Sequence, residues 1–454
     1  MALSCFKAYD IRGKVPEQLS VALAYDIARA FAAEIQPTKV VVGYDIRLES
    51  PEIAASIRQG LLDAGVNVVD IGLCGTEEVY FNTPYLNADG GIMVTASHNP
   101  KGYNGLKMVR AGSRPISGDT GLKAIEQRVE ENNLPSVEEQ ENQGDLSQFL
   151  DKTPYVDHLL SYINVDSWPN MKVVFNSGNG SAGAVIEQLI DRLPIEPIYV
   201  HLEPNGEFPN GVPNPLLVEN RNSTAKAVVD SGADFGVAWD GDFDRCFFFD
   251  KEGRFIEGYY VVGLLAASLL NVNPGEKIIH DPRLTWNTID IVQGKGGVPI
   301  QSKTGHAFIK EIMRSEDAVY GGEMSAHHYF RQFNYCDSGM IPWLLVAQLL
   351  ADSTQSLADM VKERISMFPC SGEINFRVSD IPTTIQRVTE YYAEYNPRFD
   401  HTDGVSMVFS EWRLNIRSSN TEPLLRVNIE SRGSVDLVQE KIKEVSGLIN
   451  QGER

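Results

Sequence analysis

The chain has 454 residues, of which 43% are hydrophobic and 22% charged, a composition typical of a globular protein with several domains. Its formal net charge of −21 argues against a nucleic-acid partner, because proteins that bind nucleic acids normally carry a basic surface. No apolar run reaches the roughly 18 residues that cross a bilayer, so we expect a soluble protein. The five cysteines are scattered and form no CxxC pair, which favours reduced thiols and a cytoplasmic protein.

Three stretches repeat one order of predicted elements. Each opens with a lysine and a short β-branched strand, then turns through a polar loop into a helix, at residues 39–50, 172–183 and 277–288. A second strand follows at NVVDIG, PIYVHL and VPIQSK, and a third strand ends in the loops TASHNP, DGDFDR and GEMSAHH. Alternating strands and helices predict three related α/β domains with mixed or parallel sheets, which bind ligands at the carboxyl ends of their strands.

The last part of the chain departs from this pattern. A strand at GEINFRV, an amphipathic helix, two strands around RSSNTEP and a final helix predict a smaller α+β domain with an antiparallel sheet. The acidic, polar stretch from about 130 to 148 is predicted to connect the first two domains. We therefore predict α/β domains at residues 1–150, 151–254 and 255–369, and an α+β domain at 370–454.

Three aspartates at alternate positions, Asp240, Asp242 and Asp244, follow the third strand of the second repeat. Converging carboxylates repel each other unless a cation lies between them, and oxygen ligands favour Mg²⁺ or Ca²⁺. An EF-hand loop starts with the same spacing, but Arg245 and Lys251 stand where that loop needs glycine and glutamate. The loop predicts a catalytic Mg²⁺ site, with Arg245 ready to contact a phosphate; a solvated acidic turn is the alternative.

Two further loops combine charged and hydroxyl side chains. Glu323, Ser325 and His327 alternate, which on an extended segment places them on one face, suited either to sugar hydroxyls or to buried structural hydrogen bonds. The KTGH segment adds His306 nearby in the sequence. The turn NIRSSNTEPLLRV predicts a phosphate cradle built from Arg417, Ser419, Asn420, Thr421 and Arg426.

Ser97 stands beside His98 in the loop TASHNP, a pair that suggests a hydrolase. Neighbouring side chains on an extended segment point to opposite faces, so we expect His98 to be badly placed to take the Ser97 proton. A serine in a chain with a predicted Mg²⁺ site and phosphate cradle indicates instead a carrier of a phosphoryl group.

The loops TASHNP, DGDFDR, GEMSAH and RSSNTEP, in this order over the whole chain, resemble those of the α-D-phosphohexomutase superfamily. Longer stretches such as CFKAYDIRGK and NGVPNPLL are similar to its bacterial phosphomannomutase/phosphoglucomutase branch. The resemblance implies four domains around one central cleft. It also implies reversible interconversion of mannose 6-phosphate and mannose 1-phosphate through a phosphoserine and a hexose 1,6-bisphosphate, an activity that supplies GDP-mannose synthesis.

The same resemblance implies a role for each site residue. Ser97 would be the phosphoserine and would complete the Mg²⁺ site of Asp240, Asp242 and Asp244, while His98 or Lys107 would move the hydroxyl proton. Sugar contacts would come from Glu323, Ser325, His327 and His306, and the distal phosphate would lie against Arg417, Ser419, Asn420, Thr421 and Arg426. Further contacts in the cleft would come from Tyr9, Arg12, Arg245 and Arg283.

Other functions stay open at this point. Phosphoglucomutase or dual-specificity activity would use the same loops, and mannose and glucose differ at one hydroxyl. A Mg²⁺-dependent sugar phosphatase would not need the separate phosphate cradle, and a non-catalytic sugar-phosphate sensor would need neither Ser97 nor the aspartates. We expect hexose phosphates as substrates and a hexose 1,6-bisphosphate as activator; the sequence leaves open whether the protein is a monomer or a dimer.

Overall fold

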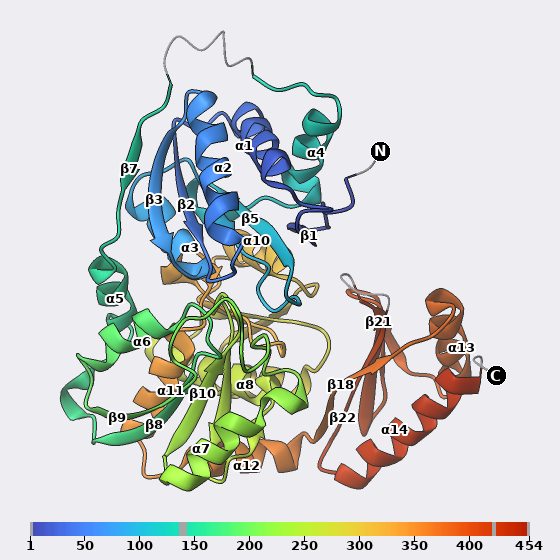
Figure 1. Cartoon of the computed structure of the whole chain (residues 1–454). Coiled ribbons are helices and arrows are strands. Elements are labelled where there is room, and N and C mark those ends of the chain that lie inside the picture. Colours follow the sequence, from blue (N-terminus) through green and yellow to red (C-terminus); the bar gives the residue numbers. More distant parts are fainter. Residues whose placement is uncertain (1–2, 136–142, 420–423, 452–454) are drawn as a thin grey trace. The chain divides into compact units, whose positions relative to one another are not determined.

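The computed structural model describes residues 3–135, 143–419 and 424–451 (Figure 1). Two compact units divide the chain: the first comprises residues 1–255 and 327–354, and the second comprises 256–326 and 355–454. None of the helices in the described ranges combines the length and the apolar character that a membrane span requires.

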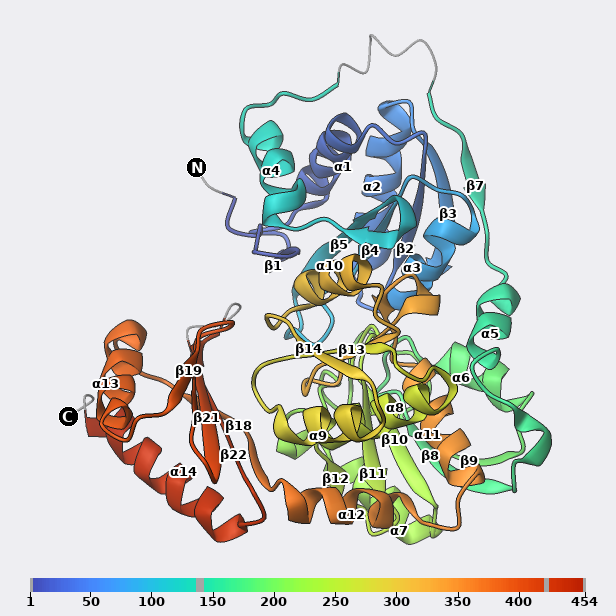
Figure 2. The same cartoon turned by 180° about the vertical axis from the view of Figure 1, so that it is seen from behind.

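The first sheet has the strand order β1-β5-β4-β2-β3-β7, with β6 beside β5. Its parallel strands are β2 (Lys39–Tyr44), β3 (Asn67–Leu73), β4 (Gly90–Val94) and β7 (Leu146–Gln148). The antiparallel strands are β1 (Ile11–Lys14), β5 (Tyr103–Arg110) and β6 (Arg114–Pro115). The helices of this domain are α1 (Val21–Ile35), α2 (Ser50–Asp63), α3 (Thr76–Tyr85) and α4 (Leu122–Glu130) (Figures 1 and 2).

Helices cover both faces of this sheet because its central strands are apolar on both faces. Val40 and Val42 of β2 pack into one core with residues of α1, α2 and α4. Val41, between them, points to the other face and packs with Val79 of α3. The loops at the carboxyl ends of these strands are left to carry the polar side chains.

The second sheet has the order β12-β11-β10-β8-β9, in which β8 is parallel to β9 and β10, and β10 is antiparallel to β11. The strands are β8 (Met171–Asn176), β9 (Ile195–Val200), β10 (Phe235–Trp239), β11 (Cys246–Asp250) and β12 (Phe255–Ile256). Three helices lie near these strands in the chain, α5 (Thr153–Leu160), α6 (Gly183–Ile190) and α7 (Asn222–Ser231). A fourth helix of the first unit, α11 (Ile341–Ala351), comes from later in the chain. Phe175 stacks on Trp239 and meets Trp343 of α11 edge-on, so α11 packs on this sheet.

In the third repeat, β13 (Lys277–His280) is parallel to β14 (Val298–Gln301) and β15 (Tyr320–Gly322). The first unit contains the antiparallel pair β16 (His328–Phe330) and β17 (Cys336–Asp337). The helices of the third repeat are α8 (Gly258–Val272), α9 (Trp286–Gly294), α10 (His306–Glu316) and α12 (Leu357–Met367). In all three repeats, therefore, the first strand lies between the second and the third, as one shared domain plan requires.

The last sheet is antiparallel throughout, in the order β18-β22-β21-β20-β19. Its core joins Leu414 and Val427 to Val388 and Val445 of the helices, so α13 and α14 cover one face. The elements are β18 (Cys370–Phe376), α13 (Ile381–Ala393), β19 (Arg398–Asp400), β20 (Val405–Val408), β21 (Trp412–Ser418), β22 (Leu425–Ser431) and α14 (Val435–Asn450). Short 3₁₀ turns lie at Ala111–Ser113, Gly118–Thr120, Val165–Ser167, Val218–Asn220 and Arg331–Phe333.

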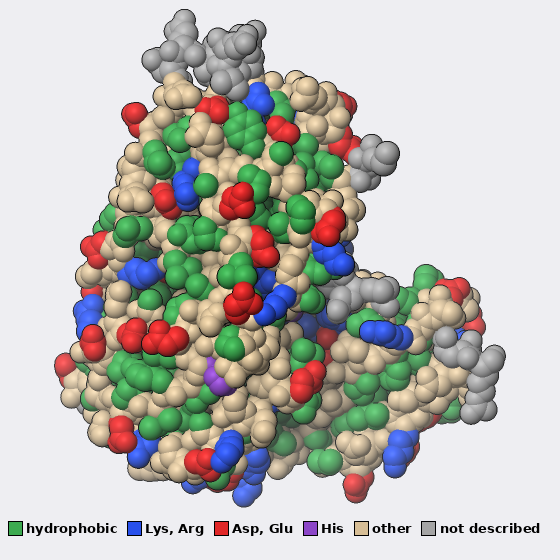
Figure 3. All heavy atoms as spheres, viewed as in Figure 1, with side chains coloured by type: hydrophobic (Ala, Val, Ile, Leu, Met, Phe, Trp, Pro, Cys, Tyr) green, Lys and Arg blue, Asp and Glu red, His purple; other side chains and the backbone are tan. Residues whose placement is uncertain are grey.

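The predicted fold class is confirmed: three related α/β domains with mixed sheets precede an α+β domain with an antiparallel sheet. The predicted connector is in part a strand, since β7 joins the first sheet; residues 136–142 of that stretch lie outside the described residues. On the face drawn in Figure 3, acidic and basic side chains are interspersed among hydrophobic ones.

Candidate functional site

The serine loop after β4 and the aspartate loop after β10 meet in the first unit. The Ser97 hydroxyl donates to Asp240 Oδ2 over 2.9 Å, and both residues are buried. The backbones also approach closely, because a Cβ on Gly241 would lie 2.5 Å from the Ser97 carbonyl oxygen. Glycine at position 241 is therefore what lets the two loops touch.

Ser97 has a φ of +50°, in the left-handed region of backbone conformation that residues other than glycine rarely adopt. Because this loop is not extended, the expectation that His98 points away from Ser97 is wrong. His98 Nδ1 lies 3.1 Å from Ser97 Oγ and 2.6 Å from Arg245 Nη2. Burial and the charge of Arg245 lower the pKa of His98 well below its usual value, so the ring is neutral at neutral pH.

The three predicted metal ligands come together, since carboxylate oxygens of Asp240, Asp242 and Asp244 lie within 4.8 Å of one another. All three are buried, and burial raises the pKa of Asp240 to about 6 even though Arg245 opposes that shift. Each aspartate uses Oδ2 for hydrogen bonds to protein groups. Within the described residues, the three Oδ1 atoms have no hydrogen-bond partner. Buried oxygen atoms in this state fit a hard divalent cation such as Mg²⁺.

Lys107 lies between two of these aspartates. Its ammonium group is 2.6 Å from Asp242 Oδ2 and 2.5 Å from Asp244 Oδ2. Burial alone would lower the pKa of Lys107, but the two carboxylates raise it above its usual value. Lys107 is therefore a protonated donor in this arrangement, which makes it a poor acceptor of a proton.

The expectation that the segment from Glu323 to His327 is extended is wrong. Ala326 has a φ of +70°, so the segment turns there and is not extended. His327 Nδ1 lies 2.9 Å from Asp337 Oδ2, and ligand atoms of Asp244, His327 and Asp337 lie within 4.8 Å of one another. His327 thus joins the aspartate loop in the first unit.

Glu323 and Ser325 instead meet Arg283 in the second unit. Arg283 Nη2 lies 3.4 Å from Glu323 Oε1 and 3.2 Å from Ser325 Oγ. Burial alone would lower the pKa of Arg283, but the carboxylate of Asp281, 2.7 Å away, raises the pKa above its usual value. The amide of Gly305 donates to Glu323 over 3.0 Å, which places His306, the first residue of α10, beside this loop.

Three arginines converge on Glu373 in the second unit. Arg417 lies 3.2 Å, Arg426 3.3 Å and Arg283 3.6 Å from its carboxylate. Arg417 and Arg426 stand directly opposite each other on β21 and β22, a pairing of like charges that is unfavourable without an anion. Arg283 also pairs with Asp281 and Glu323, and Arg417 Nε lies 4.0 Å from Asp403 Oδ2. The guanidinium forks of Arg417 and Arg426 are the groups here that suit a phosphate.

The remaining predicted residues have these places. The Ser419 amide donates to the Leu424 carbonyl over 2.8 Å, and Asn420 and Thr421 lie outside the described residues. Tyr9 lies in the bend before β1. Arg12 of β1 donates to Asn99 Oδ1 over 2.7 Å, so it contacts the serine loop.

The sequence reasoning missed the polar residues that begin α3. Thr76 donates to Asp242 Oδ2 over 2.5 Å, and its amide donates to the Asp242 carbonyl over 3.1 Å. Buried Glu77 accepts hydrogen bonds from Tyr155, Ser338 and the amide of Gly339. The available signal was GTEE, a polar stretch directly after the second strand of a repeat.

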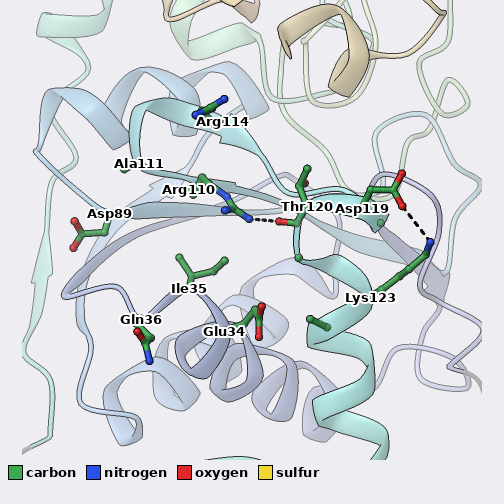
Figure 4. A pocket seen from close by; sticks show the side chains of 13 residues that line it. Glu34, Ile35, Gln36, Asp89, Arg110, Ala111, Arg114, Asp119, Thr120 and Lys123 are labelled. Atoms are coloured by element: carbon green, nitrogen blue, oxygen red, sulfur yellow. Dashed lines mark hydrogen bonds and ion pairs between the residues drawn. The ribbon is translucent and has the colours of Figure 1, made fainter.

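A pocket elsewhere in the first domain contains none of the predicted site residues. Figure 4 shows it between the end of α1, the end of β5 and the start of α4, lined by the basic residues Arg110, Arg114 and Lys123 and by the acidic residues Glu34, Asp89 and Asp119. Lys123 pairs with Asp119 over 3.3 Å, and Arg110 donates to the Thr120 carbonyl. Its charges are of both signs and largely exposed, so we assign no ligand to it.

Comparison with known proteins finds similarity along nearly the whole chain. Models of the phosphoglucomutase/phosphomannomutase family match residues 4–135 (alpha/beta/alpha domain I), 153–253 (domain II), 257–368 (domain III) and 373–447 (C-terminal domain). A protein of Xanthomonas campestris named phosphohexose mutases is 56% identical over 449 residues, covering 99% of this chain and 100% of the relative. The phosphomannomutase of Salmonella typhimurium is 55% identical over 454 residues, covering 99% of each chain.

Solved structures show the same architecture. A phosphoglucomutase/phosphomannomutase family protein from Burkholderia thailandensis superposes with a TM-score of 0.88 at 29% identity, covering 100% of this chain and 98% of the other. The phosphoglucomutase parafusin of Paramecium superposes with a TM-score of 0.74 at 16% identity, covering 98% of this chain and 95% of the other. At this identity the comparison shows a shared fold only.

Proposed function

Because the chain belongs to the phosphoglucomutase/phosphomannomutase family, we propose that it interconverts mannose 6-phosphate and mannose 1-phosphate through phosphorylated Ser97. The reaction is that of a phosphomannomutase, an isomerase that moves a phosphoryl group within one sugar. The observation that carries the proposal is the Ser97 hydroxyl, which donates to Asp240 beside three buried Oδ1 atoms suited to a cation.

The catalytic cycle consists of two phosphoryl transfers. In the first, the bond from phosphorus to Ser97 Oγ breaks while the free sugar hydroxyl forms a bond to phosphorus and loses its proton. The sugar becomes a 1,6-bisphosphate and reverses its orientation. In the second, Ser97 Oγ loses its proton and forms a bond to the other phosphorus, while the bond from that phosphorus to the sugar oxygen breaks and this oxygen takes up a proton. The phosphoserine is regenerated and the isomer is released.

Asp240, Asp242 and Asp244 would hold Mg²⁺, which would offset the negative charge of the transferring phosphoryl group. Thr76 and Lys107 orient Asp242 through its Oδ2 atom, and this leaves Oδ1 for the cation. Arg245 holds Asp240 and lies against His98, which places a guanidinium group beside Ser97.

Of the two candidates for moving the hydroxyl proton, we favour His98, because Lys107 is already protonated. Its ring is neutral and lies 3.1 Å from Ser97 Oγ. Lys107 is held as a cation by two aspartates and would act by its charge.

In the second unit we assign sugar recognition to Glu323 and Ser325, with His306, and phosphate binding to Arg417 and Arg426, with Ser419, Asn420 and Thr421. In the first unit we assign a sugar contact to His327, which lies beside Asp244. The cluster of Arg283, Arg417 and Arg426 around Glu373 supports binding of an anion. A cradle that contacts the phosphate and not the sugar ring can bind the phosphate at either end of the bisphosphate. We also assign substrate contacts to Tyr9 and to Arg12, which contacts the serine loop.

Several finer assignments accompany this proposal. A hexose 1,6-bisphosphate would act as activator by phosphorylating bare Ser97, and the product mannose 1-phosphate would supply GDP-mannose synthesis. Five free thiols support a cytoplasmic location. The domain boundaries 1–150, 151–254, 255–369 and 370–454 enclose the four family matches.

The decisive experiment is a coupled assay of the purified chain with mannose 1-phosphate and with glucose 1-phosphate, at saturating Mg²⁺ and with catalytic glucose 1,6-bisphosphate. We expect higher kcat/KM for mannose 1-phosphate, and no turnover of either sugar by Ser97→Ala. Substantial turnover by that variant would refute the phosphoserine cycle, and a preference for glucose 1-phosphate would replace phosphomannomutase by phosphoglucomutase activity.

A further inference from the structure

Arg47 is a buried arginine in the loop between β2 and α2, outside the predicted site. Its side chain is 2% exposed and binds carbonyl groups of the serine loop. Nη2 donates to the Ser97 carbonyl over 2.8 Å and to the Asn99 carbonyl over 2.6 Å. Nη1 donates to the carbonyls of Pro100 and Tyr103 over 3.1 and 3.0 Å. One guanidinium group thus ties together the loop from Ser97 to Tyr103.

The guanidinium group is itself held firmly. Its Nε lies 3.5 Å from Asp45 Oδ2, and its carbon lies 5.5 Å from the centre of the Phe208 ring. Asp45 Oδ1 accepts from the Arg47 amide over 3.0 Å. Burial and a planar fork of donors together fix the direction in which Arg47 points.

A second connection runs from Asp45 to Ser97 through Thr95. The Thr95 hydroxyl donates to Asp45 Oδ2 over 2.6 Å and accepts from the Ser97 amide over 2.8 Å. Asp45 and Thr95 are both buried. The amide and the carbonyl of Ser97 are therefore each bonded to a chain of residues that begins at Asp45.

This double attachment accounts for the conformation of Ser97. A residue other than glycine at a φ of +50° is strained, and such strain persists only where surrounding contacts determine the backbone. We propose that Asp45, Arg47 and Thr95 form a serine clamp, whose role is to hold Ser97 Oγ in line with the transferring phosphoryl group. They are positioning residues, since their contacts are to the serine loop.

The proposal rests on the proposed function of Ser97 and predicts a particular kinetic effect. Misplacing a reacting atom by about 1 Å can lower a rate by about 100-fold, whereas sugar binding depends on other residues. Lysine at position 47 keeps the charge but cannot reach four carbonyl groups with a fork of donors. We expect Arg47→Lys to lower kcat for mannose 1-phosphate by about 100-fold while KM changes less than about threefold.

A matched control is Arg387→Lys in the C-terminal domain, where Arg387 donates to the carbonyls of Leu448 and Ile449 over 3.1 Å. Both variants lose hydrogen bonds from a guanidinium group to backbone carbonyls, but only Arg47 makes these bonds to the serine loop. We expect Arg387→Lys to keep the parent kcat. A kcat within about threefold of the parent for Arg47→Lys, or an equal loss in both variants, would overturn the clamp.

Thr95 provides an independent test if Arg47→Lys does not fold. Thr95→Val keeps the shape and removes the hydroxyl, while Thr95→Ser keeps the hydroxyl. We expect kcat to fall about tenfold or more in Thr95→Val and to return toward the parent value in Thr95→Ser. Parent-like kcat in Thr95→Val, or equal loss in both, would contradict the proposal.

The same assays separate this proposal from the proposed function. If Ser97→Ala retains turnover, the phosphoserine cycle is wrong. If Ser97→Ala is inactive while Arg47→Lys and Thr95→Val turn over normally, the cycle stands and only the clamp fails.

Discussion

Ser97 donates its hydroxyl to Asp240 over 2.9 Å, although the two residues are 143 positions apart in the chain. The contact joins the end of β4 to the end of β10 and brings a serine against a set of buried carboxylates. A phosphate on Ser97 would bring further negative charge to these carboxylates, and Mg²⁺ held by the aspartates would neutralise it.

Phosphorylation of Ser97 should therefore depend on Mg²⁺. After incubation with glucose 1,6-bisphosphate and Mg²⁺, we expect the peptide that contains Ser97 to carry one phosphoryl group by mass spectrometry. Incubation with EDTA should prevent this, and Ser97→Ala should stay unmodified. An active enzyme whose Ser97 never carries phosphate would argue against the cycle.

Asp242→Asn should weaken the metal site without disrupting the fold. The change keeps the size of the side chain but removes the negative charge facing the cation, so we expect the Mg²⁺ concentration for half-maximal activity to rise about tenfold or more. The rise in Tm on adding Mg²⁺ to the apo-protein should shrink in parallel. Asp230→Asn, which alters an exposed aspartate paired with Lys226, is the control. Unchanged Mg²⁺ dependence of both readouts would exclude Asp242 as a ligand.

Arg417→Ala should weaken the binding of both substrates, mannose 1-phosphate and mannose 6-phosphate, by a similar factor. Removing one guanidinium group from the cluster around Glu373 takes away a partner for phosphate, whichever end of the sugar carries it. We expect KM for mannose 1-phosphate and mannose 6-phosphate to rise by a similar factor, about tenfold or more. Steady-state kinetics in both directions measures this. A loss confined to one isomer would show that the cradle does not serve both orientations.

His158 should make the fold less stable in acid. It lies in an aromatic cluster with Phe81, Tyr162 and Phe333, and burial lowers its pKa below the usual value. As pH falls below about 6.5, the unfolded chain binds a proton at His158 that the folded chain does not bind, so stability is lost. Above that pH both forms are neutral and the effect vanishes.

The test replaces the titrating ring by one that does not titrate. Urea unfolding at pH 7, 6 and 5 should show His158→Phe becoming progressively more stable relative to the parent as pH falls. Phe333→Leu, which changes the same cluster without a titratable group, should differ from the parent by a constant amount. A constant difference for His158→Phe as well would mean that His158 does not titrate differently on folding.

The sequence determined the fold class and the order of the repeats, and it predicted that three aspartates come together. These follow from local patterns: β-branched runs followed by polar loops mark strand ends, and three aspartates at alternate positions favour a cation where their carboxylates converge. The strand pairings of all three repeats agree with that pattern.

Only the tertiary structure decided which side chains meet. The turn at Ser97, with a φ of +50°, brings His98 toward Ser97, where an extended chain predicts the opposite. The turn at Ala326, with a φ of +70°, interrupts the extended segment that the alternation of Glu323, Ser325 and His327 predicts. Arg47 carried no signal in the sequence, because its partners are backbone carbonyl groups about 50 positions away, which every residue possesses. The hydrophobic periodicity of the sequence indicates which helices and strands form. Left-handed turns and hydrogen bonds to backbone carbonyls depend instead on packing between loops that are distant in the chain.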